Sequence, residues 1–380
     1  TTAGTVSAWI LVKSGTTVQA IVNKYNAGTG NREFRLTIES DEKPQWNVQS
    51  AIGSFDSNTL AKSGTALSED TWNHIVGTFS ANNAPKLYVN GSLVATASSN
   101  IDADGIDNGN SPIFFGRGIN NTSVTEIVNA GTKITDVAIW NAELSAADIS
   151  DIYNSGEPTD LTLAASYDTD RTSNLKGYWR MGNGTLDGND GSDSSTWLIA
   201  DQTDATLGSE LIIANPYVAA SWSTYGTNVE SFVSGESVTI TYGNSSSGSL
   251  ATFNNSTNNI LESNIVAGKK YKFSFTLATD DTDVNPILLG ADEGNIYAGT
   301  GAGDKIIYFT GKSSGSPTFR VISLSAGKYY TLSNLSLKQV GGNPGTSVNM
   351  ATDDVVELAP NRLTGTMTNM ASGDLETDVP

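Results

Sequence analysis

Short runs of strand-forming residues, separated by polar turns, recur along most of this 380-residue sequence. In the first 160 residues these runs occupy 6–12, 18–24, 34–38, 46–49, 72–79, 86–89, 93–97, 113–116 and 134–140. Asn90 and Gly91 separate two of them. Both residues accept the positive φ of a type I′ turn, so the pair predicts a β-hairpin. The pattern as a whole favours an all-β fold.

One helix is expected to interrupt these strands. Ser145 has the position of an N-cap, and Asp148 follows three residues later at the capping-box position. Ile149 and Ile152 supply an apolar face at helical spacing, and Gly156 is the expected stop.

A second β-rich region spans about 207–340. In the stretch "KKYKFSFTL", Tyr271, Phe273 and Phe275 alternate with polar residues, which is typical of a half-buried strand. Similar runs occupy 238–242, 305–309, 318–322 and 330–337, a spacing that predicts a second β-sandwich. The stretch "GGNPG" that follows has the composition of a linker. We therefore predict three parts, at 1–205, 206–341 and 342–380.

The charge of the chain limits its partners. Forty acidic residues against 21 basic ones give a net charge of −19. Such a surface repels nucleic acid and anionic membranes, but it suits a protein that gathers divalent cations. The absence of cysteine excludes disulfides and thiol chemistry. No apolar run is long enough to predict membrane insertion.

Several stretches resemble known families. Together, "VSAWILV", "WNHIVGTF", "KLYVNGSLVATA", "IFFGRG" and "ITDVAIWNAELSAADISDIYNSG" resemble the laminin-G/concanavalin-A-like domain of the pentraxin type, over most of residues 5–156. "LGSELIIANPYVAASWSTYG", "IVAGKKYKFSFTL" and "YYTLSNLSLKQV" resemble a carbohydrate-binding-module-like jelly roll. These resemblances imply a concanavalin-A-like β-sandwich followed by an inserted second jelly-roll sandwich.

The insertion is implied by a third resemblance. "NLKGYWRMGNG" at 174–184 and "LTGTMTNMASGDLETDVP" at 363–380 resemble two pieces of one lead-in segment, found in structural proteins of tailed phages, marine ones especially. The tail at 342–380 is then expected to return to the first domain or to a neighbouring subunit. We expect residues 178–181 or 365–370 to pair with the first strand, because an open apolar edge invites aggregation.

The single histidine, His74, is expected to be a strand residue. It lacks the further ligands that a zinc site requires. No Gly-x-Ser-x-Gly accompanies it, and no Glu-x-Asp-x-x-Glu string of the concanavalin-like hydrolases occurs. We expect that the protein is not an enzyme. The sequence alone leaves a Ser-His-Asp catalytic arrangement open as the alternative.

A calcium site is one candidate for function. Asp102, Asp104 and Asp107 lie in one glycine-rich loop, and calcium prefers several oxygen ligands on a flexible loop. The loop resembles an EF-hand loop but lacks its closing glutamate, so a solvated acidic loop is the alternative.

Glycan binding is the second candidate. Sugars are bound by aromatic faces together with polar groups at loop tips. The candidate contacts are Tyr25, Trp46, Tyr88, Arg117, Tyr217, Trp222 and Tyr225. Trp46 is included because Pro44 and Gln45 indicate an exposed edge, whereas the jelly-roll resemblance places Trp222 under its sheet.

These features favour a non-enzymatic virion surface or structural protein: a capsid decoration, fibre or tail-associated protein. Its expected partners are other virion proteins, copies of itself and host-surface glycans. A secreted calcium-dependent adhesin or lectin is the first alternative. Accessory carbohydrate-binding modules of a larger glycosidase are the second. A purely architectural role without sugar is also compatible with the residues.

Overall fold

We describe the protein from a computed structural model. It describes residues 1–26, 31–50, 59–106, 112–120, 123–126, 128–163, 166–181, 188–189, 197–222, 227–243, 247–252, 260–291, 294–312, 317–322, 325–342 and 345–347. The chain divides into two compact units, with Thr1–Gly184 in unit 1 and Thr185–Val355 in unit 2. The predicted domain limits at 205 and 341 stay predictions. The predicted return of the tail at 342–380 also concerns residues that are mostly outside it.

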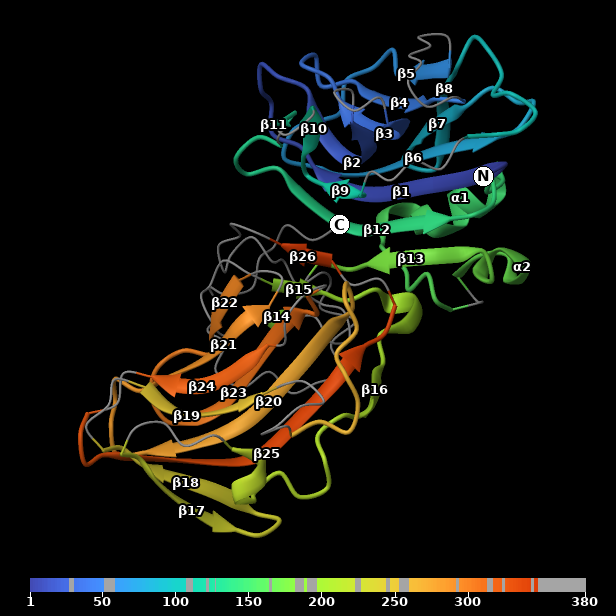
Figure 1. Ribbon diagram of the computed structural model, residues 1–380. Helices are drawn as coiled ribbons and strands as arrows, with labels where there is room; N and C mark the ends of the chain where they lie inside the picture. Colours follow the sequence, from blue (N-terminus) through green and yellow to red (C-terminus); the bar gives the residue numbers. More distant parts are fainter. Residues whose placement is uncertain are drawn as a thin grey trace. The chain divides into compact units, whose positions relative to one another are not determined.

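Unit 1 consists almost entirely of strands (Figure 1). Its elements are β1 (Ala3–Leu11), β2 (Gln19–Asn26), β3 (Asn31–Ile38), β4 (Pro44–Val48), β5 (Leu60–Lys62), β6 (Trp72–Ser80), β7 (Lys86–Val89), β8 (Ser92–Thr96), β9 (Phe114–Phe115), β10 (Gly118–Asn120), β11 (Ser123–Thr125), β12 (Lys133–Trp140), α1 (Ala146–Tyr153), η2 (Asn154–Gly156), α2 (Thr169–Thr172) and β13 (Leu175–Trp179).

Two sheets form the sandwich of unit 1. Sheet A has the order β13-β12-β1-β6-β7-β8, and sheet B the order β11-β10-β2-β3-β4-β5, with β9 beside β2. Trp46 of β4 fills the space between them, and its Nε1 donates to the carbonyl of Thr78 in β6 at 3.1 Å. Phe34 packs against Trp46, with ring centroids 5.7 Å apart. The alternation of β3 and β4 therefore directs Phe34 and Trp46 inward.

The first strand is not an edge. β1 pairs with β6 on one side and with β12 on the other. The expectation that 178–181 would cover it is therefore wrong, since β13 pairs with β12 instead. The other candidate, 365–370, lies outside the described residues.

The local predictions on the hairpin and the helix start are confirmed. Asn90 and Gly91 have φ values of 49° and 76° between β7 and β8. Ser145 and Asp148 form a complete capping box at the start of α1. The helix ends earlier than predicted, because Asn154 takes the left-handed conformation (φ 47°) before Gly156 is reached. Asparagine adopts this conformation more readily than most residues.

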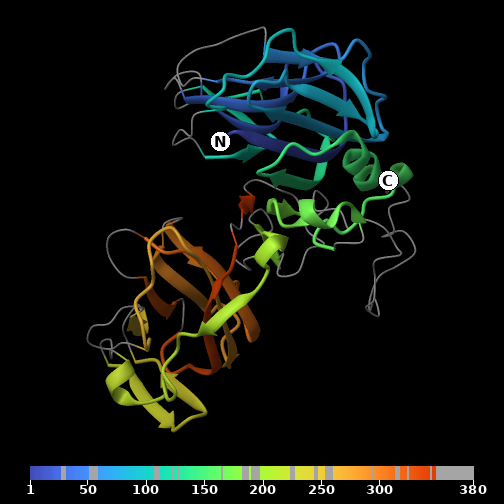
Figure 2. The same cartoon turned by 90° about the vertical axis from the view of Figure 1, so that its right-hand side faces the viewer.

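Helix α1 covers the outer face of sheet A (Figures 1 and 2). Ile149 and Ile152 pack with Val76 of β6 and with Trp140 of β12 in a buried cluster. None of the described helices has the length and apolar character that crossing a membrane requires.

Unit 2 is a second set of sheets. Its elements are β14 (Gly188–Asn189), β15 (Trp197–Ile199), η4 (Gln202–Asp204), β16 (Leu207–Glu210), η5 (Ala219–Ser221), β17 (Val229–Val233), β18 (Ser237–Thr241), β19 (Ser247–Thr252), β20 (Lys270–Thr279), β21 (Asn285–Ala291), β22 (Gly294–Tyr297), β23 (Gly303–Thr310), β24 (Thr318–Ile322), β25 (Tyr329–Val340) and β26 (Gly345–Ser347).

A sandwich forms the core of unit 2. One sheet has the order β17-β18-β25-β20-β23, with β16 beside β25, and the other the order β19-β24-β21-β22. A small sheet, β14-β15-β26, completes the unit. Phe273 and Phe275 of β20 each contact Phe319 of β24, with centroids 5.0 Å apart in both pairs. The predicted alternation in β20 is confirmed, as is the all-β fold class with two sandwiches.

Candidate functional site

A row of polar residues crosses the outer face of sheet B, the face that points away from sheet A. Asn23 of β2 pairs with Arg35 of β3, and Arg35 pairs with Asn47 of β4. On the other side Asn23 pairs with Phe114 of β9. Paired residues share a face, and Arg35 and Asn47 alternate with the inward Phe34 and Trp46. The four residues therefore line up across neighbouring strands.

The row contains polar atoms that lack hydrogen-bond partners. Asn23 and Asn47 are 1% and 0% exposed. The described structure gives no partner to Asn23 Oδ1, Asn47 Nδ2 or Arg35 Nε. Buried polar groups in native proteins are almost always bonded, and leaving one unmet costs about 1–3 kcal/mol. The row thus presents one acceptor and two donors without partners.

Arginines lie over aromatic rings on the same face. The Arg35 guanidinium is 4.9 Å from the centre of the Tyr25 ring, and that of Arg32 is 5.9 Å from it. The Arg117 guanidinium is 4.7 Å from the centre of the Phe114 ring. Such cation–π contacts hold the guanidinium planes in place. We call Tyr25, Arg32, Arg35, Phe114 and Arg117 the arginine face.

The arginine face is positively charged in a chain that is strongly negative. Arg35 Nη1 donates to Glu126 at 3.0 Å, and Lys24 Nζ donates to Glu33 at 2.5 Å. Arg32 and Arg117 are further basic side chains of the face. The chain as a whole carries −19. Guanidinium groups gathered in this way attract anions.

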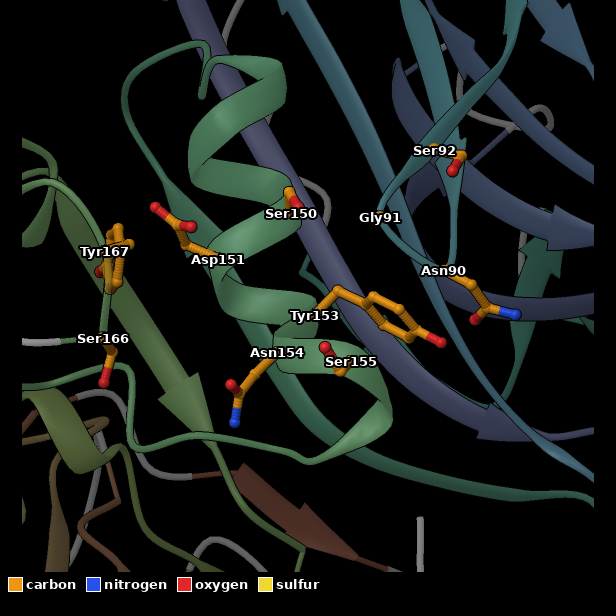
Figure 3. A pocket seen from close by; sticks show the side chains of 10 residues that line it. All are labelled: Asn90, Gly91, Ser92, Ser150, Asp151, Tyr153, Asn154, Ser155, Ser166 and Tyr167. Atoms are coloured by element: carbon orange, nitrogen blue, oxygen red, sulfur yellow. The ribbon is translucent and has the colours of Figure 1, made fainter.

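A separate pocket lies on the side of unit 1 that carries α1 (Figure 3). It has a volume of about 670 Å³ and is lined by Asn90, Gly91, Ser92, Ser150, Asp151, Tyr153, Asn154, Ser155, Ser166 and Tyr167. The β7–β8 turn forms one wall, and the C-terminal end of α1 forms another. The lining contains neither lysine nor arginine.

The predicted glycan contacts separate into accessible and buried residues. Tyr25 and Arg117 belong to the arginine face and are half-buried. Tyr225 lies outside the described residues. The other predicted contacts are buried in the cores of their units: Trp46, Tyr88, Tyr217 and Trp222. The structure leaves these four side chains almost no exposed surface, and their role as glycan contacts stays a prediction.

The burial of these four side chains has physical causes. Trp46 lies between the sheets of unit 1, because Gly77 of β6 leaves room for its indole. Tyr88 belongs to the cluster beneath α1. Tyr217 accepts from the Leu335 amide at 3.0 Å, and Trp222 donates to the Pro216 carbonyl at 2.8 Å. The expectation that Trp222 packs under its sheet agrees with its burial.

His74 is a buried strand residue, as predicted. It lies in β6, is 2% exposed, and its Nε2 is 2.8 Å from Ser7 Oγ. Its ring stacks on Trp9, with centroids 5.0 Å apart. Burial lowers the pKa of His74 to about 3. Among the described residues no group bonds to Nδ1, so the carboxylate that orients a catalytic histidine is not found there.

The predicted calcium loop is only partly described. Asp102 and Asp104 are exposed, and Asp107 lies outside the described residues. The Asp102 amide donates to Ser50 Oγ at 3.1 Å, which places the loop beside the end of β4. Within the described part of the chain no three His, Cys, Asp or Glu side chains gather as metal ligands. Two carboxylates alone supply fewer oxygens than calcium takes.

Calcium binding at this loop stays a prediction that titration calorimetry tests. If the three aspartates hold calcium, the wild-type protein gives heat at millimolar calcium. Asp102→Asn removes one charged ligand and is expected to weaken binding by about tenfold or more. Equal isotherms for the two proteins, or no heat from either, would contradict the prediction.

Several residues of the arginine face were not singled out from the sequence. Arg32 and Arg35 belong to β3, whereas Phe114 lies about 80 residues further along the chain in β9. The stretch "REFRLTI" indicates a strand with one polar face. Its polar residues Glu33, Arg35 and Thr37 alternate with the apolar residues Phe34, Leu36 and Ile38. Where a strand is buried on both faces, polar residues on one of them indicate that this face has a binding partner.

Comparison with known proteins bears on unit 1. Residues 1–150 match the Concanavalin A-like lectin/glucanases superfamily. A comparison with curated proteins finds no match. The match agrees with the predicted laminin-G/concanavalin-A-like resemblance. The match covers less than half of the chain. It says nothing about a phage origin.

Solved structures with similar folds include a pentraxin and two sialidase-related proteins. The native heptameric SAP-like pentraxin of Limulus polyphemus is 15% identical (40% of this chain, 71% of that chain, TM-score 0.31). The Ruminococcus gnavus IT-sialidase CBM40 is 18% identical (40% and 83%, TM-score 0.34). The Trypanosoma rangeli sialidase is 14% identical (42% and 24%, TM-score 0.30). Scores this low support no statement about ligand or activity.

Proposed function

We propose that this protein is a lectin-like surface protein that binds acidic saccharides at the arginine face of unit 1. One observation carries the proposal. Guanidinium groups, each placed over an aromatic ring, share a sheet face with buried polar atoms that lack partners. The match of residues 1–150 to a superfamily that includes lectins supports the same conclusion.

The chemistry of the face suits a carboxylated or sulfated sugar. A guanidinium can donate two parallel hydrogen bonds to a carboxylate or sulfate, and these are among the stronger hydrogen bonds in proteins. Sugar hydroxyls both donate and accept. They can therefore bond to guanidinium N–H groups of the face, whereas Asn23 and Asn47, which are 1% and 0% exposed, are out of reach of a ligand. An anionic group on the ligand gives the guanidinium groups a partner of opposite charge.

We further propose that unit 1 binds without catalysis. A glycosidase places two carboxyl groups across its cleft, one of them as an acid that donates a proton. Among the described residues the carboxylate bound to an arginine of the face is Glu126, which Arg35 holds at 3.0 Å. That pairing favours a positioning role, in which Glu126 orients Arg35.

Removing one arginine of the face is expected to weaken acidic-sugar binding selectively. Arg117→Ala loses charged hydrogen bonds worth about 1.5–3 kcal/mol, which corresponds to about tenfold to hundredfold in Kd. Arg35→Lys keeps the positive charge beside Glu126 but loses the planar guanidinium group, which can donate two parallel hydrogen bonds. We therefore expect a smaller loss of affinity than for Arg117→Ala. Calorimetry with sialylated, uronic-acid and sulfated oligosaccharides measures both effects.

Two matched controls make this test specific. Lys176→Ala removes one positive charge from an exposed position of β13 and is expected to bind as wild type does. Carboxyl-reduced uronic-acid oligosaccharides keep the sugar but lose the anion, and should bind much more weakly. If Arg117→Ala and Lys176→Ala lower affinity equally, the face is not the binding site.

The cellular setting is proposed to be the surface of a virion, where copies of this protein assemble with other virion proteins. The resemblance of 174–184 and 363–380 to tailed-phage structural proteins supports this, although the second segment lies outside the described residues. A secreted adhesin, or accessory modules of a glycosidase, would use the same face. Light scattering of the purified chain tests the oligomer, and a monomer would count against self-assembly.

A further inference from the structure

The Arg35 guanidinium of the arginine face is paired within the chain. Its Nη1 donates to Glu126 Oε1 at 3.0 Å. The two side chains are 16% and 28% exposed, so the pair lies near the surface and within reach of a ligand. The Tyr25 ring, whose centre is 4.9 Å from the guanidinium carbon, covers one flat side of the group. An incoming anion therefore meets a guanidinium whose charge is already partly neutralised.

The remaining nitrogens of Arg35 offer a second carboxylate little. A carboxylate binds most strongly when two parallel N–H groups of a guanidinium donate to it. One such pair consists of Nε and Nη2, but Nε of Arg35 is buried. The other consists of Nη1 and Nη2, and it includes the nitrogen that Glu126 holds. A ligand that accepts two hydrogen bonds from Arg35 must therefore compete with Glu126 for Nη1.

The backbone keeps Glu126 beside Arg35. Glu126 directly follows β11 and has φ 54°, in the left-handed region that few residues other than glycine, asparagine and aspartate adopt. Non-glycine residues in this region cluster at ligand sites and switch regions. The Glu126 carbonyl accepts from the Ala20 amide of β2 at 2.9 Å, and β2 pairs with β3. A group tethered in this way competes at a high effective concentration.

The second accessible arginine of the face differs in this respect. Arg117 lies over the Phe114 ring at 4.7 Å, and no carboxylate of the described residues pairs with it. An anion meets Arg117 without a competitor, whereas at Arg35 it must replace Glu126. A sugar hydroxyl carries no charge, and hydrogen bonds between charged groups are the stronger ones. A neutral sugar is therefore a poor replacement for Glu126.

We propose that Glu126 is a built-in competitor of the ligand, which occupies Arg35 until an anionic group on a saccharide displaces it. The inference rests on the proposed function, because it concerns the same face. Glu126 orients Arg35 within the chain, lowers the affinity of the face for acidic saccharides, and restricts Arg35 to ligands that carry an anion. Removing the competition is then expected to strengthen binding.

Calorimetry with sulfated and uronic-acid oligosaccharides tests this inference on two variants. Glu126→Gln keeps an oxygen that accepts from Arg35 but loses the charge. It should bind about twofold to fivefold more tightly than the wild type does, which is the range expected from the loss of one partly exposed ion pair. Glu126→Ala also loses the acceptor that orients Arg35, so it should gain less than Glu126→Gln.

Two further variants separate competition from a general effect of charge. Glu143→Gln removes the same charge from a carboxylate that pairs with Lys86 of sheet A at 2.7 Å, and it should bind as the wild type does. Glu126→Asp keeps the charge but shortens the side chain by one methylene, which weakens its hold on Arg35. It should therefore bind acidic oligosaccharides more tightly than the wild type does.

The outcomes distinguish failure of this inference from failure of the proposed function. If the wild type binds acidic oligosaccharides and Glu126→Gln binds them equally or more weakly, Glu126 only orients Arg35 and the inference is wrong, while the arginine face stands. An equal gain for Glu143→Gln, or no gain for Glu126→Asp, would also overturn it. If neither the wild type nor Glu126→Gln binds, both proposals are wrong. Binding by Glu126→Gln alone would support both.

Discussion

Lowering the pH from 7 to 3 is expected to destabilise unit 1 by about 4 kcal/mol through His74 alone. Burial lowers the pKa of His74 to about 3 in the folded protein, against about 6.5 in the unfolded chain. The unfolded chain therefore binds a proton between pH 6.5 and 3 that the folded protein does not. This contribution is fully present above pH 6.5 and is lost as the pH falls toward 3.

The surroundings of His74 explain why the folded protein cannot accept the proton. Its Nε2 already faces Ser7 Oγ, and its ring is enclosed in the stack with Trp9 and Tyr153. Nδ1 has no partner among the described residues. A charged imidazolium would be desolvated with no carboxylate to compensate for it.

Calorimetric unfolding between pH 3 and 7 measures this effect. His74→Gln can still bond to Ser7 but does not titrate, so its unfolding free energy should fall less steeply with pH. The difference between wild type and variant isolates His74 from the carboxylates, which titrate in the same range. Parallel curves for the two proteins would show that His74 does not cause the loss.

Trp46→Ala is expected to destabilise unit 1 by about 3–5 kcal/mol. The indole is 0% exposed between the two sheets, and the Thr78 carbonyl would lose its donor. Chemical denaturation gives the value, and Trp46→Phe should cost less because it fills part of the cavity. A change below about 1 kcal/mol would mean that Trp46 is not a core residue.

The glycine opposite Trp46 offers a direct check on this packing. A Cβ atom at Gly77 would lie 2.2 Å from Trp46 Cδ2. Gly77→Ala should therefore destabilise the wild-type protein, and should cost much less when Trp46 is already alanine. Additive effects of the two substitutions would contradict the contact.

Local features of the fold could be predicted because they depend on neighbouring residues. The turn at Asn90–Gly91, the cap at Ser145 and the alternation in β20 each follow from a few adjacent side chains. Strand pairing could not be predicted in this way. β1 lies between β6 and β12, which are about 70 and 130 residues away along the chain. Tyr178 and Trp179 pair with β12, the outer neighbour, instead.

The same limit applies to the candidate sites. The composition of "REFRLTI" indicates a polar strand face, but the arginine face also requires Tyr25, Phe114 and Arg117 from other strands. Trp46 was predicted to be exposed from its neighbours Pro44 and Gln45. It is buried because Gly77, about 30 residues away, leaves space for it. The pocket combines a hairpin turn with a helix end, which no single stretch of sequence reveals.

A glycan array probed with the purified chain, once in calcium and once in EDTA, tests the central claim most directly. We predict binding to glycans that carry carboxylate or sulfate, weakened at high salt because the arginine face acts through charge. Binding that EDTA removes would add the Asp102–Asp107 loop to the site. If a well-folded sample binds no charged glycan in either condition, the protein is not a lectin for acidic saccharides.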